Sequence, residues 1–180
     1  MTITEHIAAV RREMAEAARE SGRSERDIFL VGASKMNDAA ACQEAIAAGV
    51  DALGENRVQE MTAKLAQNAY DGAPLHFIGH LQRNKVKYIV EKVALIHSVD
   101  TYRLAEEINI QAKKRGIIVP ILVEVNIAGE ETKFGTTAED AMLLVEEISK
   151  LENVRIRGLM TIAPFVENPE DNRLYFRKIK

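Results

Sequence analysis

Short apolar runs alternate with longer amphipathic segments along the whole chain. Six runs are rich in β-branched and aliphatic residues, as strands are, and cover residues 27–34, 51–56, 75–80, 94–100, 119–127 and 155–164. Between them lie five segments with helical spacing of their apolar positions, at residues 39–49, 57–67, 83–93, 102–116 and 138–152. Regular alternation of strands and helices predicts an α/β fold built on a parallel sheet.

An amphipathic helix is predicted before the first strand. Thr2 and Glu5 have the spacing of a capping box, and Ser21 marks the end of this helix. Its apolar face comprises Ile7, Val10, Met14 and Ala17. A second capping box, from Thr136 to Glu139, predicts the start of the helix at residues 138–152.

The most apolar strands favour a sheet that is covered on both faces. Residues 117–125, IIVPILVEV, are apolar almost throughout, as in a strand with helices on one side and a barrel interior or a second helix layer on the other. Both a (β/α) barrel and a doubly wound sheet have this pattern. No linker or low-complexity segment divides the chain, so we predict a single domain over residues 1–180.

The last residues of the sequence predict one further helix. Asn168 is a candidate N-cap with Pro169 at the first helical position, and the sequence stops at Lys180. A closed eight-stranded barrel usually needs roughly 200 residues or more. If the fold is a TIM-type barrel, we therefore expect about six of the eight β/α units to be present, in a chain truncated from a longer protein.

Charge and cysteine content narrow the classes of partner. The net charge of −3 and the isoelectric point near 5.9 provide no basic field, so we expect no nucleic-acid partner and no binding to an anionic membrane. Cys42 is the only cysteine, which excludes an intramolecular disulfide and suits a reducing, cytoplasmic location. The N-terminal segment carries charges among its apolar positions, and no apolar run approaches the ~18 residues of a membrane span.

Polar side chains gather where the predicted strands end. Ligands of parallel α/β folds bind at the carboxyl ends of the strands. The residues that lie there, in chain order, are Ser34, Lys35, Glu55, Asn56, His80, Gln82, Asn84, Ser98, Asp100, Asn126, Met160 and Thr161. Several also have a plainer interpretation, Lys35 as a solvated lysine and Asn56, Asn84 and Asp100 as helix N-caps.

Other familiar site patterns are missing from the sequence or fail on geometry. Neither standard glycine-rich nucleotide loop is present, and no Ser-His-Asp assignment can be defended. His76 and His80 stand four residues apart, which on a strand is about 13 Å at ~3.3 Å per residue and too far to share a metal ion. We therefore predict no metal site. The loop from Gly129 to Gly135 is either a flexible lid or a solvated connection.

Lys35 has one chemical use that the other polar residues lack. A lysine that is partly desolvated at the end of an inner strand keeps its amine available near neutral pH. Such an amine condenses with an aldehyde to form a Schiff base, and pyridoxal phosphate is the commonest aldehyde cofactor of this kind. No convincing acid–base pair accompanies Lys35 in the sequence.

Six motifs in order and in register extend this picture to a family resemblance. They are VGASKMND (31–38), GENRVQE (54–60), HFIGHLQRNKVKYIV (76–90), IHSVDTYRLAEEIN (96–109), VEVNIAGEETKFG (123–135) and IRGLMTIAP (156–164). With these motifs the chain resembles the pyridoxal phosphate homeostasis protein family, whose fold is similar to the barrel domain of alanine racemase. The resemblance extends from about residue 5 to the end of the chain.

The resemblance implies a (β/α) TIM-type barrel that carries pyridoxal 5'-phosphate in a Schiff base on Lys35. It also implies that Asn56, His80 and Met160 lie at the mouth of the cofactor site, and that no residue is catalytic. The implied role is a carrier and regulator, which holds the cofactor, delivers it to apo-enzymes and limits the free aldehyde, with a monomer as the full-length state. In the family two further β/α units bind the phosphate, so we expect the phosphate-binding residues to lie outside this chain and the chain itself to self-associate.

Two other functions stay open at this point. One is a pyridoxal-phosphate-dependent enzyme of the amino-acid racemase type, since alanine racemase shares the barrel. Racemisation needs a second base on the opposite face of the cofactor ring, and the sequence offers no counterpart to the one in alanine racemase. The other is an inactive or regulatory truncated remnant that binds protein partners through exposed sheet edges.

Overall fold

A computed structural model describes residues 1–180 and shows the predicted alternation of strands and helices. The strands are β1 (Val31–Ala33), β2 (Ala52–Glu55), β3 (Leu75–Phe77), β4 (Leu95–Val99), β5 (Val119–Glu124) and β6 (Val154–Met160). The α-helices are α1 (Ile3–Glu20), α2 (Ala39–Ala47), α3 (Val58–Leu65), α4 (Val86–Ile89), α5 (Tyr102–Arg115), α6 (Ala141–Ser149) and α7 (Arg173–Ile179). Short 3₁₀ helices cover Glu25–Asp27, Arg83–Lys85 and Pro169–Asn172. The six parallel strands and the N-terminal helix confirm the predicted α/β class.

Contacts within the chain define two compact units, Met1–His76 and Phe77–Lys180. In the first unit the strands follow the order β1-β2-β3, and β1 pairs with β2 in parallel from Val31 opposite Ala52 to Ala33 opposite Gly54. All four residues of β2 are buried, whereas Ala33 at the end of β1 is exposed. The core of this unit is therefore centred on β2.

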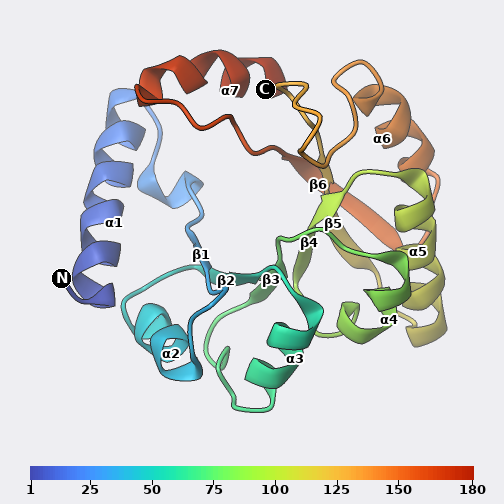
Figure 1. The fold of residues 1–180 in the computed structure, drawn as a ribbon, viewed down its shortest axis with the longest axis horizontal. Coiled ribbons are helices and arrows are strands. Elements are labelled where there is room, and N and C mark those ends of the chain that lie inside the picture. The colour runs from blue at the N-terminus through green and yellow to red at the C-terminus, as the bar shows by residue number, and fades with distance from the viewer. The chain divides into compact units, whose positions relative to one another are not determined.

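Helix α1 lies beside α2 in the first unit (Figure 1). The predicted capping box is confirmed, because the amide of Glu5 donates to Thr2 Oγ1 at 3.2 Å and the amide of Thr2 donates to Glu5 Oε2 at 2.8 Å. The predicted apolar face is less covered than expected, with Val10 exposed and only Ala18 buried along the helix. Arg11 attaches α1 to the turn before β2 through the carbonyl of Gly49, 2.7 Å from its Nη2.

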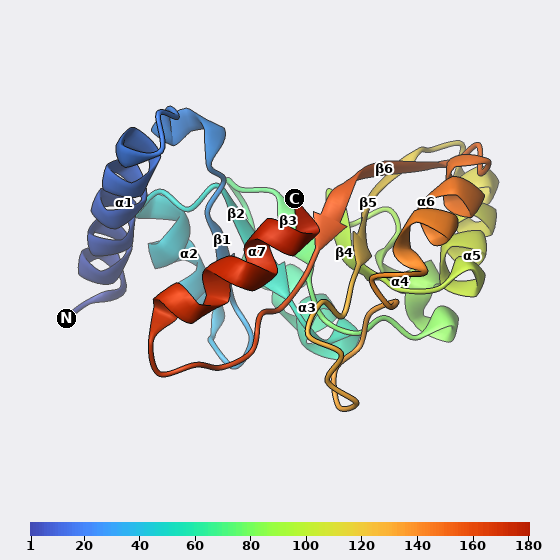
Figure 2. The same cartoon turned by 90° about the horizontal axis from the view of Figure 1, so that it is seen from above.

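In the second unit the strands follow the order β4-β5-β6, all parallel, and α4, α5 and α6 lie on one side of them (Figures 1 and 2). The pairing of β5 with β6 runs from Val119 opposite Val154 to Glu124 opposite Met160. Helix α5 buries Leu104, Ala105, Ile108 and Ala112 at helical spacing. It ends at Gly116, whose φ of 66° is the left-handed conformation of a glycine C-cap.

Two predicted helices differ from the structure. The segment at residues 83–93 forms only a 3₁₀ turn and the four-residue α4, because its β-branched residues have low helix propensity and Val86, Ile89 and Val90 are held by burial. The capping box predicted from Thr136 to Glu139 is wrong. The backbone of Thr136 pairs with the end of β5. Thr137 accepts from the amide of Asp140 and donates its hydroxyl to the Asp140 carboxylate, and α6 begins at Ala141 without a side-chain cap.

The segment after β6 forms the predicted cap. Asn168 Oδ1 accepts from the amide of Glu170 at 3.2 Å, and Pro169 opens the 3₁₀ turn that leads into α7. No helix in residues 1–180 is both long and apolar enough to cross a membrane.

Candidate functional site

Lys35 lies in a tight turn just beyond strand β1. The turn runs from Ser34 to Asn37 and is closed by the amide of Asn37, which donates to the carbonyl of Ser34 at 3.1 Å. Lys35 is exposed, and no hydrogen bond or ion pair engages its Nζ. The prediction that this amine is partly desolvated is wrong. Strand β1 ends at Ala33, and Lys35 follows it in the exposed turn.

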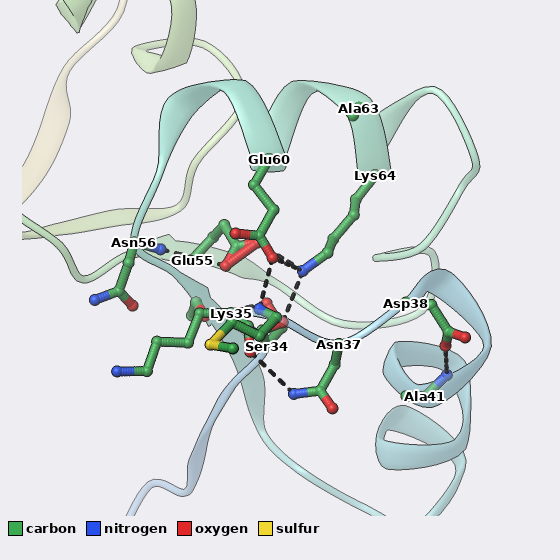
Figure 3. Close-up of polar contacts among 12 residues, drawn as sticks. Ser34, Lys35, Asn37, Asp38, Ala41, Glu55, Asn56, Glu60, Ala63 and Lys64 are labelled. Atoms are coloured by element: carbon green, nitrogen blue, oxygen red, sulfur yellow. Dashed lines mark hydrogen bonds and ion pairs between the residues drawn. The ribbon is translucent and has the colours of Figure 1, made fainter.

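A second lysine, Lys64 of α3, lies buried behind this turn (Figure 3). Its Nζ donates to the carbonyl of Ser34 at 2.7 Å, to Glu55 Oε2 at 2.9 Å and to Glu60 Oε1 at 2.8 Å. Lys64 is 6% exposed and Glu55 is fully buried at 0%. One ammonium group therefore joins the turn, the end of β2 and helix α3.

The charges in this cluster stabilise one another. Burial alone would lower the pKa of Lys64, but hydrogen bonds to Glu55 and Glu60 outweigh it and raise that pKa above its ordinary value. The hydrogen bond from Lys64 holds the pKa of Glu60 below its usual range. Tyr70 donates its hydroxyl to Glu55 Oε2 at 3.2 Å. Lys64 is thus a fixed ammonium ion, unsuited to act as a nucleophile.

Sequence reasoning missed Lys64 altogether. The available signal was the spacing of Glu60 and Lys64, four residues apart on one helix, directly after the polar end of β2 at Glu55. That spacing is common on solvated helix faces, so the pattern alone does not predict a buried ion network.

Met36 has a strained backbone at the third position of the turn. Its φ is 64°, in the left-handed region that favours glycine. Replacing Met36 with glycine is expected to raise the free energy of unfolding by about 0.5–1 kcal/mol, because glycine adopts this conformation without a steric penalty. The side chain is 92% exposed, so little packing is lost. Urea denaturation measures the change.

The matched control for this prediction is Met142→Gly. Met142 is 75% exposed in the first turn of α6, where glycine is expected to lower the free energy of unfolding by up to about 1 kcal/mol, the cost of glycine in a helix interior. A loss of stability at both positions would contradict the assignment of strain to Met36.

Asn56 follows β2 and faces the same side as Lys35 (Figure 3). Its Oδ1 is buried and has no hydrogen-bond partner, and its amide donates to Glu55 Oε1 at 3.3 Å. The alternative of Asn56 as a helix N-cap is wrong, because Arg57 occupies the N-cap of α3. The first unit therefore brings together a free amine and an unpaired amide oxygen.

The N-cap interpretation also fails for the other two residues to which it was applied, Asn84 and Asp100. Gln82 occupies the N-cap of the 3₁₀ turn at Arg83–Lys85, which leaves Asn84 inside that turn. Thr101 caps α5 by accepting from the amide of Leu104, and Asp100 precedes it. Asp100 instead contributes charge near Glu124, as its effect on the pKa of that carboxyl shows.

His80 and Met160 belong to the second unit. The exposed ring of His80 stacks on Phe134, with 3.8 Å between ring centroids and 15° between planes. Met160 is the half-buried last residue of β6, and its carbonyl accepts from the amide of Val125 at 2.8 Å. That either residue contacts a cofactor stays a prediction.

The loop from Gly129 to Gly135 is an ordered connection. The side-chain amide of Asn126 donates to the carbonyl of Glu130 at 2.8 Å, and Asn126 Oδ1 accepts from the amide of Glu130 at 3.2 Å. Lys133 Nζ donates to the carbonyl of Ala163 at 3.2 Å, just after β6. These bonds favour the connection over the flexible lid.

The two histidines of the rejected metal pair have separate environments. His76 is buried in β3 and stacks on Phe29 with 5.7 Å between centroids, and burial lowers its pKa. No group of three or more His, Cys, Asp or Glu side chains in residues 1–180 is arranged to hold a metal ion.

Comparison with known proteins gives consistent matches along the chain. The family described as "Alanine racemase, N-terminal domain" matches residues 6–180. A protein of Aquifex aeolicus named "Pyridoxal phosphate homeostasis protein" is 44% identical over 180 residues, which are 100% of this chain and 79% of the relative. The chain belongs to the pyridoxal phosphate homeostasis protein family.

Two solved structures place this family member in structural context. PipY of Synechococcus elongatus, solved with pyridoxal phosphate bound, has 32% identity and a TM-score of 0.82, covering 99% of this chain and 78% of PipY. Alanine racemase of Clostridium difficile has 19% identity and a TM-score of 0.71 over 84% of this chain and 43% of the enzyme, which shows a shared fold. The predicted resemblance to the homeostasis family and to the racemase barrel is confirmed.

Proposed function

We propose that this chain binds pyridoxal 5'-phosphate covalently at Lys35 and acts in the homeostasis of that cofactor. Membership of the homeostasis family supports the ligand. The observation that carries the site is the free amine of Lys35, which no other group engages, in the turn after β1. The other lysine in this cluster, Lys64, is occupied by three oxygen acceptors.

The residues of the first unit fit the chemistry of such a ligand. The cofactor supplies a reactive aldehyde and a ring with polar substituents. The unprotonated form of Lys35 Nζ would add to the aldehyde carbon. A carbon–nitrogen double bond would form, and the aldehyde oxygen would leave as water with two protons from the amine. Asn56 Oδ1, buried without a partner, supplies a hydrogen-bond acceptor on the same side (Figure 3).

We propose storage and delivery to apo-enzymes in place of turnover. Figure 3 draws three carboxylates in this region, and each already accepts a hydrogen bond. Glu55 and Glu60 accept from Lys64, and Asp38 accepts from the amide of Ala41 as the N-cap of α2. Alpha-proton exchange from amino acids in deuterated water tests this directly. Appreciable exchange that depends on Lys35 would contradict a non-catalytic carrier and favour an enzyme of the racemase type.

A reducing location such as the cytoplasm suits the buried free thiol of Cys42.

Lys35→Ala is expected to abolish the imine absorbance band that forms when pyridoxal phosphate is added to the chain. Borohydride reduction of the wild-type complex should place the adduct on Lys35, as peptide mass mapping would show. Lys150→Ala is the matched control, because Lys150 is a surface lysine, 68% exposed, at the C-terminal end of α6. Adducts scattered over surface lysines, or retention of the band in Lys35→Ala, would overturn the proposal and favour an inactive remnant.

A further inference from the structure

The two peptide groups that flank Lys35 are both linked to the buried Lys64, one directly and the other through Glu60. The carbonyl of Ser34, on the N-terminal side, accepts from Lys64 Nζ at 2.7 Å. The amide of Met36, on the C-terminal side, donates to Glu60 Oε1 at 2.7 Å, and that same oxygen accepts from Lys64 Nζ at 2.8 Å. Lys64 and Glu60 therefore hold the turn on both sides of Lys35 (Figure 3).

The conformation that these bonds hold is one that the turn would not favour by itself. Met36 has a φ of 64°, which costs a side-chain-bearing residue free energy relative to glycine. Its side chain is 92% exposed and contributes little packing. Two bonds from Asn37 within the turn, to the carbonyls of Ser34 and Lys35, offset part of this cost. The charge-assisted bond from the amide of Met36 to Glu60 is the contact from outside the turn that adds to them.

Charge balance alone does not account for Glu60. The carboxylate of Glu55, at 0% exposure, already neutralises Lys64 in the interior. Glu60 adds a second carboxylate whose side chain is 26% exposed and whose oxygen is shared between Lys64 and the turn. Its specific contribution is the bond to the residue after Lys35.

We propose that Lys64 and Glu60 are positioning residues, which fix the turn so that Lys35 Nζ is presented to the aldehyde of the cofactor. This inference rests on the proposed function, because it assigns a purpose to the geometry around the attachment lysine. Lys35 extends away from the Lys64 ammonium (Figure 3), so the pair acts through the backbone and not by touching the amine. The attachment itself is the condensation described above and needs no oxidant or reductant.

Glu60→Ala tests this inference in the full chain. The variant removes the acceptor for the amide of Met36 and leaves Lys64 bonded to Ser34 and Glu55. Glu60→Gln keeps an Oε1 acceptor and is the conservative variant. Glu146→Ala is the matched control, since Glu146 and Lys150 form the same i,i+4 pair on an exposed surface, 3.6 Å apart.

Two readouts are needed. The first is hydrogen–deuterium exchange at the amide of Met36 without cofactor, which should accelerate about tenfold in Glu60→Ala, the loss expected for one charge-assisted hydrogen bond. The second is the rate at which pyridoxal phosphate attaches to Lys35, trapped by borohydride and quantified by peptide mass mapping. That rate should fall about tenfold in Glu60→Ala and stay within about twofold in Glu60→Gln and Glu146→Ala.

The outcomes separate this inference from the proposed function. Lys35 attachment at the wild-type rate in Glu60→Ala, with accelerated exchange at Met36, would overturn the positioning role alone. An absence of attachment to Lys35 in the wild-type chain would overturn the proposed function, and the positioning role with it. A merely structural role predicts a lower melting temperature in Glu60→Ala with an unchanged attachment rate per folded molecule, and would also overturn the inference.

Discussion

Replacing Lys64 with methionine is expected to lower the free energy of unfolding by about 3–5 kcal/mol. Methionine has a similar length but no charge, so the Glu55 carboxylate, at 0% exposure, loses its cation inside the protein. The carbonyl of Ser34 loses a donor in the same change. Urea denaturation followed by circular dichroism measures the difference, with the slope of the transition as a check on the two-state assumption.

The double variant Lys64→Met with Glu55→Gln identifies the cause. Removing both buried charges should recover most of the lost stability, because the main cost of the single variant is an unpaired buried charge. The glutamine amide also retains an acceptor for the hydroxyl of Tyr70. Lys150→Met is the surface control and should change stability by less than about 0.5 kcal/mol. Equal losses in the single and double variants would assign the effect to packing instead.

The order of elements could be predicted from the sequence because it depends on local patterns. The alternation of apolar runs with helical segments identified all six strands, and a capping box marked the start of α1. Predictions failed where tertiary contacts decide. Thr136 has the spacing of a cap, yet its backbone pairs with the end of β5, and no capping box forms before α6. That residues 1–180 form a single domain stays a prediction.

The candidate site shows the same division. Attachment of a cofactor to Lys35 stays a prediction, which rests on the chemistry of its amine and on the family motif. The exposure of Lys35 could not be predicted, because the end of β1 at Ala33 decides whether the lysine belongs to the strand or to the turn. The burial of Lys64 could not be predicted from the sequence for a related reason. Its three acceptors come from β2, α3 and the turn after β1, which only the folded chain brings together.

A pH effect at Glu124 is the second large expected result. Glu124 is the last residue of β5, 7% exposed, with Oε2 buried and unpaired. Burial, and secondarily the charge of Asp100, raises the pKa of this carboxyl to about 7, above its ordinary value of 4.5. The folded chain therefore binds one more proton than the unfolded chain between these two values, so stability falls as pH rises through that window and is constant above it.

Glu124→Gln is expected to remove this dependence. Between about pH 5 and 8 the wild-type chain should lose roughly 2–3 kcal/mol of unfolding free energy relative to the variant, the amount that the pKa difference implies. The measured quantity is the difference in unfolding free energy between wild type and Glu124→Gln, because His76 contributes equally to both proteins. Burial lowers the folded pKa of His76, so its contribution to stability rises with pH near its ordinary pKa of 6.5, opposite to that of Glu124. Glu60 does not interfere, since its lowered pKa makes its contribution complete above 4.5.

The decisive comparison for Glu124 is the shape of the two stability curves. Urea denaturation at half-unit pH steps should show the curves close together near pH 5 and apart at pH 8, with Glu124→Gln the more stable protein at the higher pH. Glu146→Gln, a change of the same kind on an exposed face of α6, should run parallel to wild type throughout. Parallel curves for Glu124→Gln as well would mean that the carboxylate gains a compensating donor when it ionises, so that its burial carries no penalty in the folded chain.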